Sequence, residues 1–269
     1  MTAIILTLVS VTPMGGALNR LVLSSPELTS ERIPAFFAGL HIKLFFKQPH
    51  QAELVLPQRD ENDKIVWPEA DKKPLARTYS IADFDAENQT ITVDFVLHRD
   101  YGIASEFAKM AKPGDILGFA GPGLITMVNS SAKQHLLVGD LSAMPAIAAV
   151  LNTLTHKDSV HVIIELENNV NQTLITQQYF AAREHQITFV EQKFTDKSEI
   201  LELVRNLQIS NTKDQWSIAL AGEHLTVVSI RKYLRQIDFD KKSLYAVPYW
   251  RNQQNEETYH AQRHEVMDT

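Results

Sequence analysis

The hydrophobic pattern changes its period once along this chain, and that change constrains the fold more than any other feature of the sequence. Up to about residue 124, short runs rich in β-branched and aromatic residues are separated by turn formers such as Pro13-Met14-Gly15-Gly16 and Pro113-Gly114. From residue 134 onward, short and almost fully apolar runs alternate with helix-forming stretches. The sequence therefore predicts two domains of different structural class.

The first half predicts an antiparallel β-barrel. In "TITVDFVLH" (90–98), Ile91, Val93, Phe95 and Leu97 alternate with other residues, as in a strand with one buried face. Several such strands within about 120 residues favour a closed or nearly closed barrel over an open sheet. The expected strands span 3–11, 17–25, 41–47, 77–85, 90–98 and 115–122.

One helix is expected within this half, at 105–112. Ser105 has the side chain of an N-cap residue, and Phe107, Ala108 and Ala111 fall on one apolar side. The charged stretch 57–73 is expected to be a surface loop.

The second half predicts a doubly wound parallel sheet. "QHLLVGD" (134–140) is almost entirely apolar, which is the pattern of a buried parallel strand. A helix is expected at 142–155, and strand and helix then alternate to the end of the sheet. The predicted domains are a barrel at 1–124, a linker at 125–133, an α/β nucleotide-binding-type domain at 134–247 and a C-terminal helical tail at 248–269.

Composition removes several classes of function. The net charge of −6 argues against a nucleic-acid partner held by bulk electrostatics. The chain has no cysteine, which excludes disulfides, cysteine-ligated zinc and cysteine-bound iron–sulfur clusters. There is no basic leader with a signal-type apolar core, and no run approaches the roughly 18 to 20 apolar residues of a membrane span. We therefore expect a cytoplasmic protein without a membrane partner.

Two glycine turns are expected at the carboxyl edge of the parallel sheet. Gly139-Asp140 precedes a helix that starts near Ser142-Ala143, and Gly222-Glu223 precedes another. A glycine lets backbone approach a phosphate closely, and a helix N-terminus offers unpaired N–H groups. Neither turn belongs to a G-x-G-x-x-G fingerprint. Nucleotide binding and ordinary turn chemistry both remain open at this point.

A similar arrangement ends the last barrel strand before the helix. His98 ends the strand, Gly102 lies in the loop, and Ala104-Ser105 begins the helix, so a pyrophosphate there would meet N–H groups and a hydroxyl. The alternative is a plain strand-to-helix connection with a half-exposed histidine. His260 and His264 are spaced as i, i+4, but no third ligand is apparent, so no metal site is predicted.

The segment "RTYS" is a candidate cofactor-binding strand. Arg77 and Tyr79 point to one side of a strand, and Thr78 and Ser80 to the other. Arginine binds phosphate in bidentate fashion, and a tyrosine ring can lie against a flat heterocycle. The same pair is also common on exposed strand faces.

Taken in order, these segments resemble the siderophore-interacting proteins, which are flavin-dependent ferric-siderophore reductases of the ferredoxin–NADP⁺ reductase superfamily. The resemblance runs through "GLHIKLFF", "ARTYSI", "LLVGDLSAMPAIAAVL", "LAGEHL" and "YWRNQQNEETYH", and residues 91–123 are its most specific part. The sequence departs from the family pattern at "GIAS", where a proline usually precedes Ala-Ser, and at Pro248, where glycine is usual.

The resemblance implies FAD in the barrel, with Arg77 on the phosphates, Tyr79 on the ribityl or isoalloxazine part and Ser80 at the ring edge. The implied FAD set is Arg77, Thr78, Tyr79, Ser80, Leu97, His98, Gly102, Ile103, Ala104, Ser105 and Trp250. The implied nicotinamide-nucleotide set is Gly139, Asp140, Ser142, Ala143, Gly222 and Glu223.

Anionic ferric siderophores would be bound by Lys47, Arg251 and Arg263, although such side chains are often merely solvated. The implied reaction passes electrons from NADH, NADPH or a ferredoxin through FAD to Fe(III), and it needs no catalytic acid, base or protein-bound metal. Two alternatives stay open. One is a general NAD(P)H–flavin oxidoreductase with another acceptor, and the other is a non-catalytic siderophore- or flavin-binding module.

Overall fold

The computed structural model describes residues 2–15, 17–34, 40–97, 102–123, 126–155, 158–183, 186–254 and 259. The chain divides into two compact units, Met1–Ile125 and Thr126–Thr269. Each unit has a hydrophobic core cluster of its own.

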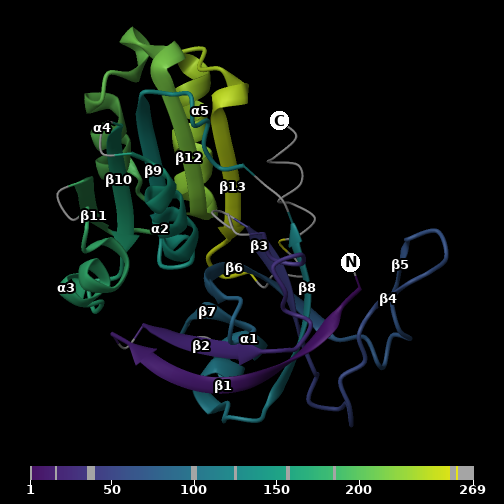
Figure 1. Cartoon of the computed structure of the whole chain (residues 1–269). Coiled ribbons are helices and arrows are strands. Elements are labelled where there is room, and N and C mark those ends of the chain that lie inside the picture. The colour runs from purple at the N-terminus through teal and green to yellow at the C-terminus, as the bar shows by residue number, and fades with distance from the viewer. Residues whose placement is uncertain are drawn as a thin grey trace. The chain divides into compact units, whose positions relative to one another are not determined.

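The first unit is a closed antiparallel barrel, as the sequence predicted (Figure 1). The strands follow one another around it in the order β1-β2-β7-β6-β3-β8. They are β1 (Ile4–Met14), β2 (Leu18–Ser24), β3 (His41–Phe46), β6 (Leu75–Asp85), β7 (Thr90–Val96) and β8 (Ile116–Gly123).

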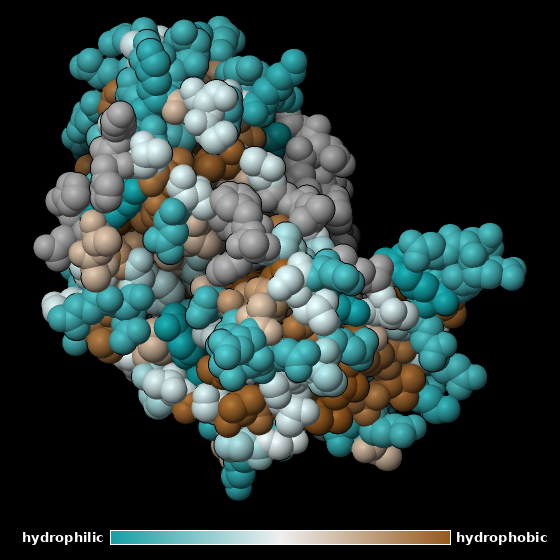
Figure 2. All heavy atoms as spheres, viewed as in Figure 1, coloured by the Kyte–Doolittle hydropathy of each residue, from teal (hydrophilic) through white to brown (hydrophobic). Residues whose placement is uncertain are grey.

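Alternation along the strands builds the barrel core. Ile91, Val93 and Phe95 on β7 are fully buried, which confirms the predicted inward face of that strand. On β1, the residues that alternate with the buried ones include the exposed Ile5 and Val9. Figure 2 shows apolar side chains gathered on the outside of the barrel unit. Helix α1 (Ile103–Met110) adds Ala104 and Ala108 to the same core.

The stretch 57–73, which we expected to be a loop, contains a small hairpin. Strands β4 (Gln58–Arg59) and β5 (Ile65–Val66) pair antiparallel. Asp60 closes the turn because its carboxylate accepts hydrogen bonds from the N–H groups of Asn62 and Lys64 at 2.9 Å. Two-residue strands are too short to leave a periodic signal in the sequence.

The second unit is a parallel five-stranded sheet in the order β11-β10-β9-β12-β13 (Figure 1). Its strands are β9 (Gln134–Asp140), β10 (Ser159–Leu166), β11 (Ile187–Glu191), β12 (Trp216–Glu223) and β13 (Leu244–Trp250). Its α-helices are α2 (Met144–Thr153), α3 (Gln172–Ile175), α4 (Ser198–Asn206) and α5 (His224–Gln236). This alternation confirms the predicted doubly wound α/β class.

The chain order places a topological switch point between β9 and β12. After β9 the chain moves outward to β10 and β11, then returns to β12 and β13 on the other side. Ligands of such sheets bind at the carboxyl ends of the strands beside that point. In the part of the sheet that the structure describes, β13 lies at the edge, and its Pro248 lies opposite Gly222 where the register with β12 shifts.

Within the alternation of strands and helices that the sequence predicts, "LITQQYFAARE" (174–184) is expected to be a helix, and α3 departs from these bounds. It begins earlier because the Asn171 side chain accepts a hydrogen bond from the Leu174 N–H at 3.0 Å, which caps its first turn. The chain then continues as a π-helical turn over Thr176–Phe180.

Candidate functional site

The "RTYS" segment lies within β6 and borders the barrel core. Its neighbour β3 sets Leu44 opposite Arg77 and Ile42 opposite Tyr79. The Tyr79 ring packs against Phe95 of β7, with ring centroids 4.4 Å apart. Arg77 is half-exposed, and its Nη1 donates a hydrogen bond to the Ala76 carbonyl at 2.9 Å. The aromatic ring is therefore fixed by the core, while the guanidinium stays near the surface.

Thr78 and Ser80 lie on the other parity of β6. The Thr78 hydroxyl accepts a hydrogen bond from Lys43 Nζ at 2.5 Å, and Lys43 is its direct cross-strand partner. Ser80 is buried. This side of the strand therefore adds hydroxyl groups and one lysine to the candidate site.

The start of α1 joins Tyr79 at the barrel core. Tyr79, Leu97 and Ile103 are half-buried side chains that pack against one core cluster, to which Ala104 also belongs. The Leu97 N–H donates to the Ala17 carbonyl at 2.8 Å, which ties the end of β7 to the start of β2. The fold thus brings together predicted residues from β6, β7 and α1. His98 lies outside the described residues.

Ser105 is not the N-cap that we expected. Helix α1 starts at Ile103 with Gly102 as its N-cap, and Gly102 has no side chain to cap the first turn. The extended backbone of Gly102 starts the helix two residues before Ser105, so Ser105 lies inside the first turn, where it is buried.

This helix start fits an anionic cofactor. Helix α1 has a glycine as its N-cap, which has no side chain to accept from the first turn, and the N–H groups of a helix start suit a phosphate. A Cβ at Gly102 would meet no atom within 4 Å, so the space beside the turn is open. Together with Arg77 and Tyr79, the donor set matches the phosphate and ring chemistry of FAD.

The predicted nucleotide residues at the sheet edge converge on one carboxylate. Asp140, buried at the end of β9, accepts hydrogen bonds at Oδ1 from the Ser142 N–H at 2.8 Å and hydroxyl at 2.6 Å. Its Oδ2 accepts from the Glu223 N–H at 2.7 Å and from Trp250 Nε1 at 2.9 Å. Asp140 therefore connects the carboxyl ends of β9, β12 and β13. Both of its carboxylate oxygens accept hydrogen bonds from the protein itself.

At both glycines of this edge, a larger side chain would collide with neighbouring atoms of the fold. A Cβ at Gly139 would lie 2.7 Å from Ala143 Cβ and 2.8 Å from Ile147 Cδ1, so glycine lets α2 pack on β9. Gly222 has a φ of +110°, and a Cβ there would lie 2.5 Å from the Asp140 carboxylate.

Trp250, which the sequence grouped with the FAD residues, lies in this same network. Besides its bond to Asp140, its ring meets Phe194 edge-on with centroids 6.0 Å apart. The indole is thus held from two sides at the end of β13.

A buried ion cluster that the sequence analysis missed lies at the same sheet edge. Lys197 Nζ binds Glu165 Oε1 at 2.9 Å and lies 3.9 Å from Glu223 Oε2. The Thr226 hydroxyl donates to Glu165, and Glu223 caps α5 by accepting the Leu225 N–H at 2.7 Å. Burial raises the pKa of the Glu165 carboxyl, against the opposing effect of Lys197. The one sequence signal was a glutamate inside the apolar run "SVHVIIEL".

The predicted siderophore residues belong to different units. Lys47 is exposed just after β3, with Nζ 3.4 Å from the Ala52 carbonyl oxygen. Arg251 is half-exposed just after β13. Arg263, His260 and His264 lie outside the described residues.

Three further features of the described residues bear on function. A surface hollow of about 490 Å³ in the first unit is lined by Thr2, Ala3 and 53–59, and none of the predicted site residues lines it. Within the described ranges, no three histidine, aspartate or glutamate side chains gather as metal ligands. In the same part of the chain, no helix is long and apolar enough to cross a membrane.

The fold and the barrel site define a class of protein. Residues 7–126 match the family model of the siderophore-interacting FAD-binding domain. A ferredoxin NADP⁺ reductase from Neisseria gonorrhoeae, solved with bound FAD and NADP, shares the fold, with a TM-score of 0.64 at 17% identity over 92% of this chain and 99% of that one. The chain is an FAD-dependent oxidoreductase of the ferredoxin–NADP⁺ reductase fold.

Within that class, the chain belongs to the siderophore-interacting protein family, whose model also matches residues 132–253. It is 32% identical to the ferric vibriobactin reductase ViuB of Vibrio cholerae over 86% of this chain and 83% of that protein. It is 30% identical to an NADPH-dependent ferric-chelate reductase of Escherichia coli over 91% of each. The siderophore-interacting protein SipS of Aeromonas hydrophila has a TM-score of 0.81 at 31% identity, over 100% of this chain and 99% of that one.

Proposed function

We propose that this protein reduces ferric siderophores, taking electrons from a reduced nicotinamide nucleotide through FAD and releasing Fe(II) for iron assimilation in the cytoplasm. The observation that carries the proposal is the joint match of both units to siderophore-interacting models, over 7–126 and 132–253. Relatives named ferric vibriobactin reductase and ferric-chelate reductase support the acceptor. A ferredoxin is the alternative donor.

We assign one of the two cofactors to each unit. FAD is assigned to the barrel domain (1–124), and the nicotinamide nucleotide to the α/β domain (134–247). We assign residues 125–133 to a linker and 248–269 to a C-terminal tail, of which residues 248–250 still belong to β13.

In the barrel domain, the residues bind and orient the cofactor. Arg77 holds the phosphates with a charge-assisted hydrogen bond, and the start of α1, whose N-cap Gly102 has no side chain, adds N–H groups to the same anion. Tyr79, fixed against Phe95, supports the ring system or the ribityl chain. Bound FAD supplies the change from two-electron to one-electron transfer.

No residue needs to act as a catalytic acid, base or iron ligand. Siderophores with hard oxygen donors prefer Fe(III), so reduction itself loosens the iron. The protein's part is to hold the chelate by charge. Lys47, Arg251 and Arg263 are the residues that we assign to this role.

Anaerobic reoxidation of the flavin tests the proposal. The full chain is loaded with FAD, the flavin is reduced by light and a sacrificial donor, and a ferric siderophore is added with a colour-forming Fe(II) chelator. We expect the flavin to reoxidise and two Fe(II) ions to form per reduced flavin, because a two-electron carrier serves a one-electron acceptor.

Other outcomes point elsewhere. A chain that never retains FAD contradicts the flavoprotein assignment. A flavoprotein that ignores ferric siderophores but reduces quinones or dyes would be a general oxidoreductase. A protein that binds siderophore and flavin without turnover would be a binding module.

A further inference from the structure

A surface groove of about 300 Å³ runs between helices α4 and α5, and the proposed function does not use it. The lining residues of α5 are spaced i, i+3, i+4 and i+7, so they share one face of that helix, and the two from α4 are spaced i, i+4. The lining residues are Leu201, Arg205, Ser229, Lys232, Tyr233 and Gln236.

Two half-buried apolar side chains lie in the groove, and exposed polar ones border it. Leu201 and Tyr233 pack against the core cluster of the second unit. Arg205, Lys232 and Gln236 are exposed. The Arg205 guanidinium lies over the Tyr233 ring, with Cζ 5.6 Å from the ring centroid, so the ring holds this cation beside the groove. An apolar floor with a polar border fits one side of an amphipathic helix.

The groove is positively charged, although the chain as a whole has a net charge of −6. Arg205 and Lys232 are the charged residues of its lining. Helix α5 also carries Arg231 and Arg235, and it contains no aspartate or glutamate. A local excess of positive charge on an acidic protein attracts an acidic partner.

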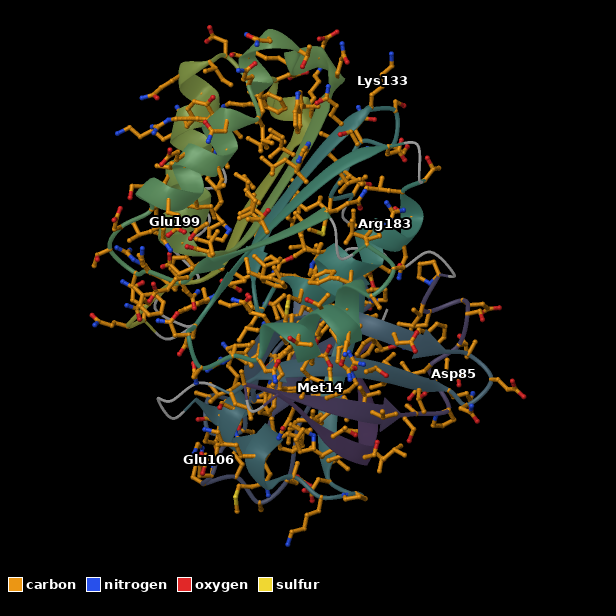
Figure 3. All side chains as sticks on the ribbon, turned by 90° about the vertical axis from the view of Figure 1, so that its left-hand side faces the viewer. Met14, Asp85, Glu106, Lys133, Arg183 and Glu199 are labelled. Carbon is orange, nitrogen blue, oxygen red and sulfur yellow. The ribbon has the colours of Figure 1, made fainter. Side chains whose placement is uncertain are left out.

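The carboxylates of α4 do not line the groove. Glu199, marked in Figure 3 at the start of that helix, binds Lys193 Nζ at 3.2 Å. Glu202 is exposed and lies outside the lining. In the described part of the chain, no ion pair joins Arg205 or Lys232 to a carboxylate. Their charges are therefore available to a partner.

The groove lies away from the sheet edge to which we assign the nucleotide. Helix α5 begins at the carboxyl end of β12 and leads back to the start of β13. Its groove residues begin at Ser229, beyond the first turn at that edge. A partner in the groove therefore leaves the Gly222-Glu223 turn uncovered, so docking here goes beyond the proposed function and does not depend on it.

We propose that the groove between α4 and α5 docks an acidic amphipathic helix of a partner protein. Apolar side chains of that helix pack on Leu201 and Tyr233, and carboxylates beside them pair with Arg205 and Lys232. A nucleic acid fits less well, because the net charge of −6 repels a polyanion. A membrane fits less well, because the apolar side chains of the groove are half-buried and not exposed.

A displayed peptide library tests the proposal on the full chain. Random peptides of about 16 residues, enough for about four helical turns, are selected for binding. Peptides that also bind the double variant Arg205→Glu/Lys232→Glu are removed. We expect the remaining sequences to be rich in aspartate and glutamate, with apolar residues at helical spacing. If no sequence remains, or if those that remain are neutral or basic, the proposal is wrong.

Fluorescence anisotropy with the most enriched peptide assigns the binding to the groove. Arg205→Glu and Lys232→Glu should each weaken it at least about 10-fold, because reversal turns attraction into repulsion. Lys133→Glu makes the same charge change at an exposed position before β9, apart from α4 in Figure 3, and should leave the affinity unchanged. Equal losses in all three variants would mean that net charge governs binding, which overturns the proposal.

Two competitors separate the classes of partner. A single-stranded oligonucleotide and vesicles of phosphatidylglycerol are added in turn to the complex with the labelled peptide. We expect neither to displace the peptide, because neither offers an apolar stripe between carboxylates. Displacement by the oligonucleotide or by the vesicles would assign the groove to a nucleic acid or to an anionic membrane and would overturn the proposal.

Discussion

At the scale of single residues, the structure shows how far predicted site residues are engaged by the protein itself. Asp140, which we predicted to border a nucleotide, accepts four hydrogen bonds at its carboxylate from three segments of the protein. Arg77, which we predicted to bind the FAD phosphates, is half-exposed, and its Nη1 donates to the Ala76 carbonyl. Both roles stay predictions.

Arg77→Ala should weaken FAD binding about 10- to 100-fold, which corresponds to losing one charge-assisted hydrogen bond of roughly 1.5–3 kcal/mol. Fluorescence titration of the apoprotein with FAD measures the effect. Arg59→Ala removes a guanidinium from the β4–β5 hairpin and serves as the control. Equal affinities for FAD in the two variants would argue that Arg77 does not touch the phosphates.

At the scale of elements, turns and caps decide where strands and helices meet. The β12–α5 junction depends on Gly222, because a positive φ and the nearby Asp140 carboxylate leave no room for a side chain. Glu223, the next residue, caps α5 and approaches Lys197. One residue change at this junction therefore acts on two buried networks.

Gly222→Ala should lower the free energy of unfolding by at least about 3 kcal/mol, of which roughly 1–2 is backbone strain and the rest is lost hydrogen bonding. Urea denaturation followed by circular dichroism measures it. Gly114→Ala is the matched control, because Gly114 has a φ of +98° but a Cβ there would meet no atom within 4 Å. A similar loss in both variants would mean that strain alone explains the effect.

Most elements could be predicted from the sequence because their hydrophobic periods are local. Strand β9 begins and ends where its apolar run does, at Gln134 and Asp140. The start of α1 was misplaced because a glycine N-cap, unlike a serine, leaves little signal. The Glu165–Lys197–Thr226 cluster was missed because its partners are 32 and 61 residues apart and only the folded sheet brings them together.

At the scale of the whole molecule, buried titratable groups link stability to pH. His135 on β9 is fully buried, and neither ring nitrogen has a hydrogen-bond partner among the described residues. Burial lowers its pKa below the ordinary 6.5, although Asp158 opposes the shift. Burial likewise lowers the pKa values of His161 and His224. Glu165 acts in the opposite direction, since its pKa is raised above 4.5.

The protein should lose stability as the pH falls below about 6.5. The reason is that these histidines bind protons in the unfolded chain at a higher pH than in the folded chain. The slope for one fully linked site approaches 1.4 kcal/mol per pH unit, as an order of magnitude. The stability contributed by protonated Glu165 is present at low pH and is lost as the pH rises through its folded pKa, so it partly offsets the loss of stability that the histidines cause in acid.

His135→Leu should reduce the loss of unfolding free energy as the pH falls. His50→Gln, at an exposed position, should leave the dependence of unfolding free energy on pH unchanged. Chemical denaturation at a series of pH values between 5 and 7.5 measures both variants. Parallel curves for the native chain and His135→Leu would show that this histidine is not linked to folding.

The proline in the last strand of the sheet has a consequence for how copies of the protein meet. Among the described residues, strand β13 has a sheet neighbour on one side only, and Pro248 removes one N–H from it. An open strand edge is a template on which another chain can add a strand, and proline is one way in which natural sheets blunt such an edge. We therefore expect Pro248 to disfavour the addition of a strand along this edge of the sheet.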